Sequence, residues 1–170
     1  MTTIERSVEV AVPVSTAYNA WTQFELFPHF MDDVEEVRQE DERHLHWRAK
    51  VWGKTEEWDA EITEQIPDKR IAWRSDGGAS NAGVVTFHRL SDDSARVMLQ
   101  LAYEPEQWSE KVGDALGIFT RRVESDLEGF KHFVENQGDR IQGWRGEIPA
   151  KGDADPRSAG NGADRLPRPS

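Results

Sequence analysis

Cysteine is absent from the 170 residues of this chain. A protein without cysteine has no disulfide framework, no thiolate ligand for zinc and no thiol nucleophile. The composition therefore excludes disulfide-stapled folds and enzymes that depend on a reactive thiol. It also suits a reducing compartment, and we expect a cytoplasmic protein.

Long apolar runs are absent as well. No stretch approaches the roughly 20 apolar residues that cross a bilayer. The first residues, "MTTIERSVEVAV", carry charges where a secretion signal would need an uninterrupted apolar segment. We therefore expect neither a signal peptide nor a membrane-spanning segment.

Positive charge is scarce. Only 21 Lys and Arg residues stand against 32 Asp and Glu residues, which gives a formal net charge of -11. A surface of this sign repels the phosphates of nucleic acids and the head groups of anionic membranes. We expect that nucleic acid is not a partner.

The common motifs of catalysis and of metal or cofactor binding are missing. There is no HExxH pair and no GxSxG elbow, and the glycine-rich segment 75–83 lacks the lysine and the following helix of a phosphate-binding loop. His44 and His46 share one face of a predicted strand, but that face is the charged outer one and no third ligand is identified. We expect no bound metal and no cofactor.

Alternating apolar and polar residues, typical of strands, run through most of the chain. Two short helical pieces interrupt them after Pro13: one with Ser15 as its N-cap and Trp21 at its end, the other over 24–31. From Gln107 to Gly138 the period changes to 3.6, which predicts one long helix with Gly138 as its C-cap. The predicted strands lie in 4–12, 34–39, 44–64 (two strands), 70–75, 82–90 and 95–103. Without β-α-β alternation, this order predicts an α+β fold whose antiparallel sheet carries the helix on one face.

Seven tryptophans stand out, three of them within residues 44–62. A two-residue hairpin loop at Gly53-Lys54 would place Trp47 opposite Ala60 and Trp58 opposite Ala49. On the outer face the same register pairs opposite charges, Lys50 with Glu57, Arg48 with Asp59 and His46 with Glu61. Both indoles then point inward and Trp52 lies among charges. A second loop at 92–94 would oppose Phe87 to Leu99, Val85 to Leu101 and Gly83 to Tyr103.

These elements resemble the SRPBCC superfamily, whose members are also called START-like or helix-grip proteins. The resemblance rests on "VPVSTAYNAWTQFELFPHFM", on the strands with "HLHWRAKV", "EWDAEITEQIPDKRIAWRS" and "NAGVVTFHRL", and on "VGDALGIFTRRVESDLEGFKHFVE". It is most similar to the bacterial branch of polyketide cyclase/dehydrase and coenzyme-Q-binding proteins. It covers about residues 2–138. It implies a seven-stranded curved antiparallel sheet wrapped around the long C-terminal helix, with an apolar cavity between them.

The resemblance implies a binding or carrier protein for a hydrophobic small molecule, such as a lipid, a quinone or a polyketide-like aromatic. The residues predicted to line the cavity are Trp47, Trp58, Trp73, Phe87, Leu99, Leu101, Tyr103, Leu116, Phe119 and Val123. The alternative is a polyketide cyclase, aromatase or dehydratase that works in the same cavity. A third alternative is an interaction module whose cavity is filled by its own side chains.

An enzyme would need an ionisable group that reaches into the cavity, and Glu64, Tyr103 and Arg89 are the candidates. Glu64 continues the inward alternation of its strand, and a four-residue turn after it would place it opposite Trp73, unless a bulge turns it to solvent. Asp126 lies at the edge of the apolar stripe of the long helix, one turn after Arg122. A salt bridge at the rim explains that pair as well as a ligand contact does.

The last 32 residues contain five Gly and four Pro and show almost no apolar periodicity. This composition is typical of a disordered tail. We therefore expect one folded domain over residues 1–138 and a disordered tail over 139–170, with Trp144 as a loose indole.

Overall fold

The computed structural model describes residues 2–51, 53–76, 81–103 and 112–150, and the side chains among them except those of residues 2, 51, 103 and 112–119. Seven strands, three short helical segments and one long helix lie within these residues. The strands are β1 (Thr2–Val10), β2 (Val34–Gln39), β3 (His44–Val51), β4 (Lys54–Ile66), β5 (Arg70–Asp76), β6 (Asn81–Ser91) and β7 (Ser94–Tyr103). The helices are α1 (Val14–Trp21), η1 (Phe24–His29), α3 (Val112–Gln137) and η2 (Gly138–Arg140). The predicted α+β fold is confirmed.

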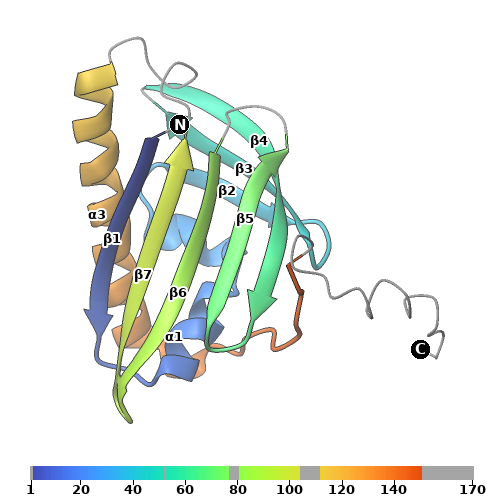
Figure 1. Cartoon of the computed structure of the whole chain (residues 1–170), viewed down its shortest axis with the longest axis vertical. Helices are drawn as coiled ribbons and strands as arrows, with labels where there is room; N and C mark the ends of the chain where they lie inside the picture. Colours follow the sequence, from blue (N-terminus) through green and yellow to red (C-terminus); the bar gives the residue numbers. More distant parts are fainter. Residues whose placement is uncertain (1, 52, 77–80, 104–111, 151–170) are drawn as a thin grey trace, which may run out of the picture.

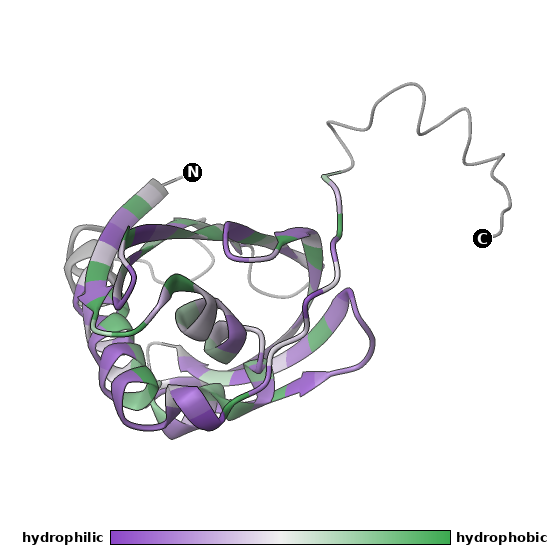
Figure 2. Ribbon diagram, turned by 90° about the horizontal axis from the view of Figure 1, so that it is seen from below, coloured by the Kyte–Doolittle hydropathy of each residue, from purple (hydrophilic) through white to green (hydrophobic). Residues whose placement is uncertain are grey.

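The strands form one antiparallel sheet in the order β1-β7-β6-β5-β4-β3-β2. The first two strands of the chain are therefore the two edges of the sheet, and α1 and η1 connect them. The sheet is strongly curved, and α3 runs beside β1 (Figure 1). Seen from below, the strands alternate hydrophilic and hydrophobic residues as the sheet curls around the short helices (Figure 2). This alternation places one face of the sheet in the interior.

The hairpin of β3 and β4 has a different register from the predicted one. Val51 pairs with Lys54, so the loop is 52–53, and Gly53 adopts a φ of +83°. Trp47 consequently lies opposite Trp58, and Ala49 lies opposite Glu56. The register is shifted by two residues. A shift of two keeps each side chain on its predicted face, because the side-chain period of a strand is two.

Two other hairpins also differ from their predicted registers. Val85 lies opposite Leu99 and Gly83 opposite Leu101, because the loop between β6 and β7 holds only residues 92–93 and a bulge follows Arg89. Between β4 and β5 the turn holds residues 67–69, and a bulge lies between Ile62 and Glu64. That bulge reverses the alternation of β4.

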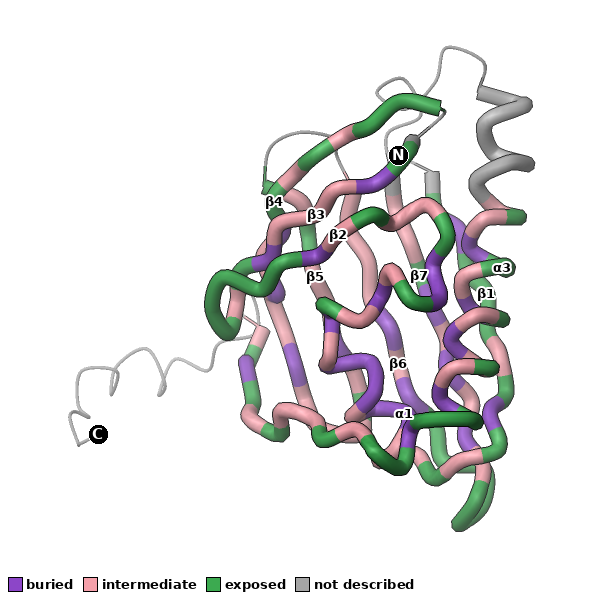
Figure 3. The backbone as a smooth tube through the Cα atoms, turned by 180° about the vertical axis from the view of Figure 1, so that it is seen from behind, coloured by how far each residue is buried: buried purple, intermediate pink, exposed green. Residues whose placement is uncertain are grey.

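The centre of the core consists of aromatic side chains from α1 and η1, which pack between the sheet and α3. Trp21 packs edge-on against Phe27 and Phe130, with ring centroids 5.4 and 4.8 Å apart. Phe30 contacts Phe130 at 5.6 Å in the same manner. Buried residues recur along the inward side of α3 (Figure 3). Helix α1 starts after Pro13, which makes no side-chain cap, so the predicted N-cap Ser15 lies inside the first turn.

Helix α3 approaches the chain at η1 very closely, and glycine makes this possible. A Cβ at Gly129 would lie 2.2 Å from the carbonyl oxygen of Phe30. The helix ends at Gln137, and Gly138 opens η2. A Cβ at Gly138 would lie 2.7 Å from Cγ2 of Val134, so this glycine also serves close packing. The predicted start of the helix at Gln107 lies outside the described residues.

The segment after η2 packs against the domain, whereas the sequence predicts a disordered tail from Asp139. Gln65 and Ile148 exchange both backbone hydrogen bonds, at 2.7 and 2.8 Å, beyond the point where β3 covers the edge of β4. Ile148 is buried, and the Trp144 N–H donates to the Thr22 hydroxyl. Arg145 forms two hydrogen bonds to Asp68 and lies over the ring of Tyr18. The folded unit therefore extends to about residue 148. The buried side chain of Ile148 and its backbone pairing with β4 hold this segment, although its sequence shows no apolar periodicity.

Candidate ligand-binding pocket

An apolar pocket of about 170 Å³ lies between the sheet, the short helices and α3. This volume is close to that of a cavity that accepts one benzene-sized ring. The lining residues from the sheet and its connections are Asp33, Val34, Leu45, Trp47, Ala49, Lys50, Trp58, Ile62, Ile71, Trp73, Asn81, Leu99 and Leu101. Those from the helical elements and the turn after η1 are Trp21, Phe24, Phe27, Met31, Arg122, Val123, Asp126 and Leu127.

Three indoles form the aromatic part of the sheet wall. The rings of Trp47 and Trp58 are parallel within 3°, with centroids 6.0 Å apart. Trp73 lies across the strand pair from Gly83, where a Cβ would lie 2.5 Å from Cζ2 of the indole. Because Gly83 has no Cβ, the Trp73 ring can lie directly against the backbone of β6 at this position. The Nε1 of Trp47 is buried and has no hydrogen-bond partner within the described part of the chain.

The opposite wall comes from residues to which the sequence analysis gave no role in the cavity. Trp21, Phe24, Phe27 and Met31 face the pocket from α1, η1 and the turn after it. Their signal in the sequence is the density of aromatic residues between the first two strands. Because these strands are the two edges of a curved sheet, the segment that connects them has to cross its concave side.

One side of the pocket is polar. Arg122 of α3 forms an ion pair with Asp33, which precedes β2, and the backbone N–H of Lys50 donates to the Asp33 carbonyl at 2.7 Å. The sequence left a rim salt bridge between Arg122 and Asp126 and a ligand contact as alternatives; the ion pair that Arg122 forms is with Asp33. Asp126 makes no hydrogen bond or ion pair with any described residue. Burial raises the pKa of Asp126 to about 7, Arg122 acts against this rise, and Asp33 and Asp32 add to it.

The structure brings six of the ten predicted cavity residues to the pocket wall: Trp47, Trp58, Trp73, Leu99, Leu101 and Val123. Phe87 instead lies in the core, where its ring packs edge-on against Tyr18 at 5.3 Å, because α1 fills the lower end of the sheet. The side chains of Tyr103, Leu116 and Phe119 lie outside the described residues. That the six wall residues bind a ligand stays a prediction.

Two of the three catalytic candidates do not reach the pocket. The bulge in β4 turns Glu64 away, where it forms an ion pair with Arg70 at 3.1 Å, and Gln65 becomes the buried residue. Arg89 is exposed and forms an ion pair with Asp92. The third candidate, Tyr103, has no described side chain. Asp126 is the acidic side chain on the helix wall of the pocket.

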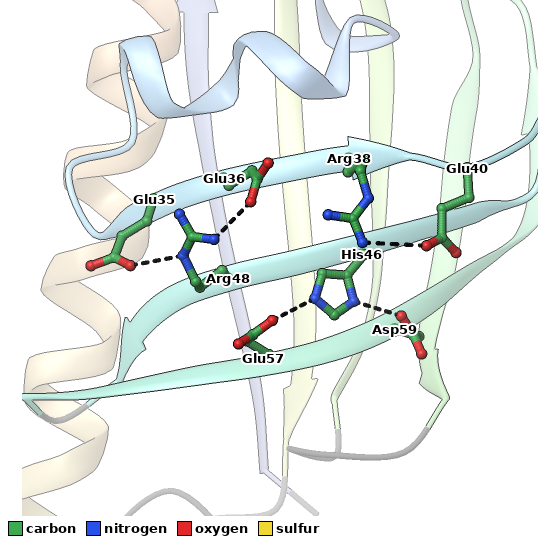
Figure 4. Close-up of polar contacts among 8 residues, drawn as sticks. All are labelled: Glu35, Glu36, Arg38, Glu40, His46, Arg48, Glu57 and Asp59. Atoms are coloured by element: carbon green, nitrogen blue, oxygen red, sulfur yellow. Dashed lines mark hydrogen bonds and ion pairs between the residues drawn. The ribbon is translucent and has the colours of Figure 1, made fainter.

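The outer face of β2, β3 and β4 carries a network of charges (Figure 4). His46 lies between Asp59 and Glu57, at 2.8 and 2.7 Å from its two ring nitrogens, and these hydrogen bonds raise its pKa. Arg48 donates to Glu35 and Glu36 of the neighbouring strand. Within the described residues no group of three or more His, Cys, Asp or Glu side chains is placed to hold a metal ion. Among the helices described, none is both long enough and apolar enough to span a membrane.

Comparison with known proteins places this architecture in context. A protein of Streptomyces lincolnensis, described as an uncharacterized 17.2 kDa protein, is 54% identical over 149 residues, which cover 87% of this chain and 99% of that relative. The Zhui aromatase/cyclase of Streptomyces sp. R1128 matches the structure with a TM-score of 0.66 at 14% identity, over 80% of this chain and 94% of that one. A START superfamily protein of Mycobacterium smegmatis matches with a TM-score of 0.62 at 15% identity, over 81% and 97%. At these identities the two structural matches concern the fold.

The sequence profile of one family matches residues 10–131, which include strands β2 to β7, the last residue of β1 and most of α3. The family and the START-like fold together support a ligand-binding or cyclase role. The chain belongs to the family of polyketide cyclases/dehydrases and lipid transport proteins.

Proposed function

We propose that this protein binds and carries a small hydrophobic molecule in the pocket between the sheet and α3. The observation that carries this proposal is the pocket of about 170 Å³ whose wall includes three indoles and several aliphatic side chains. Transfer of apolar ligand surface from water to such a wall supplies about 25 cal/mol per Å² before the cost of ordering the ligand.

Two features of the wall support a ligand rather than a filled core. Ala49, on β3, presents only a methyl group beside Trp47, and the parallel pair of Trp47 and Trp58 offers flat apolar surface to a ring. A ligand that contains an aromatic ring can lie against this surface.

The direct test is binding of 1-naphthylamine, a small uncharged fluorophore that accepts energy from tryptophan. We expect saturable energy transfer in the wild-type chain and at least tenfold weaker binding in Ala49→Leu, which places three more carbon atoms in the pocket. Ala11→Leu adds the same volume at an exposed position and serves as the control. Equal binding by all three proteins, or no binding by the wild type, contradicts the proposal. Native mass spectrometry of the purified protein would identify a ligand that co-purifies.

A second function, cyclase or dehydratase, is favoured by one observation. Asp126 lines the pocket and has a pKa of about 7, so its carboxyl group can give and take a proton near neutral pH. Such a group could act on a poly-β-keto chain that the apolar walls hold folded. A carrier returns a bound polyketide-like thioester unchanged, whereas a cyclase converts it at a rate that Asp126→Asn lowers by two or more orders of magnitude. Product analysis by mass spectrometry separates the two functions.

A further inference from the structure

The polar side of the pocket has one acidic group that forms no ion pair or hydrogen bond within the described residues. Four charged residues lie on it, Asp33, Lys50, Arg122 and Asp126. Arg122 already forms an ion pair with Asp33, and Lys50 is exposed to solvent. Asp126 has neither an ion pair nor a hydrogen bond among the described residues. A carboxylate in this position lacks the partner that a partly buried charge requires.

The rest of the pocket is suited to a positive charge. The faces of the indole rings of Trp47, Trp58 and Trp73 carry the negative side of the ring quadrupole. A cation within about 6 Å of such a face gains about 0.5–2 kcal/mol, and the gain is larger where water is excluded. The whole chain adds a long-range field of the same sign, because its formal net charge is -11. An anionic ligand would oppose all three contributions.

We infer that the pocket selects a monocation, a protonated amine attached to a small apolar or aromatic body, over neutral and anionic molecules of the same shape. The inference rests on the proposed function, because it names the chemical class of the ligand of that site. The ammonium group lies against the Asp126 carboxylate, and the apolar body lies against the indoles. No covalent step is involved.

Binding of such a ligand is coupled to the ionisation of Asp126. The charged groups around this carboxyl are Arg122 on its own helix, Asp32 and Asp33 before β2, and Lys50 on β3. In the empty pocket Asp126 has a pKa of about 7, so it is largely protonated at pH 5.5 and largely ionised at pH 8. An ammonium ion binds the ionised form. Its affinity therefore falls by up to tenfold for each pH unit below 7, whereas the affinity of a neutral ligand does not follow this course.

The test uses three probes that share one ring: 2-phenylethylamine, 2-phenylethanol and 3-phenylpropionate. Each competes with 1-naphthylamine for the full-length protein at pH 8 and at pH 5.5. We expect the amine to bind at least tenfold more tightly than the alcohol at pH 8, the carboxylate to bind most weakly, and the preference for the amine to disappear at pH 5.5. In Asp126→Asn the ratio of amine to alcohol affinity falls to about one. Glu124→Gln, on the outer face of the same helix, removes an equal charge and keeps the ratio.

The outcomes separate this inference from the function beneath it. If the fluorophore binds and the amine and the alcohol compete equally, the pocket is a general apolar site and the cation preference is refuted. The same holds if Asp126→Asn keeps the preference. If the fluorophore itself does not bind, the proposed function fails, and this inference fails with it.

Discussion

Replacing Gly129 with alanine tests the close approach of α3 to Phe30. On an exposed helix the change from glycine to alanine stabilises by about 1 kcal/mol, because alanine restricts the unfolded chain and favours the helix. Here the new methyl group would lie 2.2 Å from the Phe30 carbonyl oxygen and 3.2 Å from its carbon. Ordinary contact begins near 3.4 Å, so α3 and the chain at Phe30 must separate by about 1 Å. The atom that is struck belongs to the backbone and cannot rotate away.

The separation loosens a cluster of rings. Phe30 contacts Phe130 and Phe133 of the same helix, with centroids 5.6 and 5.0 Å away, and Phe27 at 5.4 Å. Overpacking of this kind typically costs about 1–3 kcal/mol. After the helix-forming gain is subtracted, we expect a net loss of about 1–2 kcal/mol in the free energy of unfolding.

Urea unfolding followed by far-ultraviolet circular dichroism measures this loss. Ser125→Ala, one turn earlier on the exposed side of α3, is the matched control and should unfold at the same urea concentration as the wild type or slightly higher. If Gly129→Ala is as stable as the control, α3 does not need the close approach to Phe30, and the reasoning is refuted.

Three further predictions concern the site, the charged face and the C-terminal segment. Asp126→Asn should stabilise the empty protein, and this gain in the free energy of unfolding should grow by up to about 3 kcal/mol between pH 5 and pH 8. The reason is that Asp126 keeps its proton up to about pH 7 in the folded chain, whereas in the unfolded chain it has already lost it. Equal urea midpoints across this pH range would contradict the prediction. His46→Gln should destabilise the protein more at pH 5.5 than at pH 8.5. The raised pKa of His46 adds stability that is fully present below about pH 6.5, the pKa of the unfolded chain, and is lost as the pH rises through the pKa of the folded chain. Thermal unfolding at the two pH values checks the sign of this difference. Ile148→Ala should lower the free energy of unfolding in urea by about 2 kcal/mol, as expected for a buried isoleucine. Pro149→Ala, at the exposed neighbouring position, should lower it only slightly. Equal effects of the two changes would show that Ile148 does not hold the segment.

Along β3 and the first part of β4 the face of each residue was predictable from the sequence, and the register was not. Trp47 and Trp58 point inward as the alternation predicts, because the side-chain period of a strand is two. A shift of two residues leaves both faces unchanged and still opposes His46 and Arg48 to acidic partners. The choice between the two registers was made by the loop, where Gly53 rather than Lys54 takes the second position. Charge pairing alone could not decide it.

The candidate site was predictable in part for a related reason. The wall contributed by the sheet follows from alternation, and it includes Trp73, Leu99 and Leu101. The wall from α1 and η1 does not, because a short helix has no long period and its direction depends on the sheet that it crosses. A bulge in β4 buries Gln65 in place of Glu64, and the sequence pattern of β4 does not predict this bulge. Asp126 was recognised at the edge of the helix stripe, but its lack of a partner depends on the position of Asp33 on a distant segment.

The pairing of β1 with β7 sets an order in time for the synthesis of this chain. Ile4 lies opposite Leu101, and Val10 lies opposite Ala95, so the first strand to leave the ribosome cannot find its neighbour until almost the whole sheet has been translated. At about 5–20 residues per second this wait lasts roughly 5–20 s. During it, the apolar face of β1 and the aromatic residues of α1 and η1 have no sheet to cover them. The N-terminal segment of this protein therefore waits, with its apolar residues uncovered, until translation of the sheet is nearly complete.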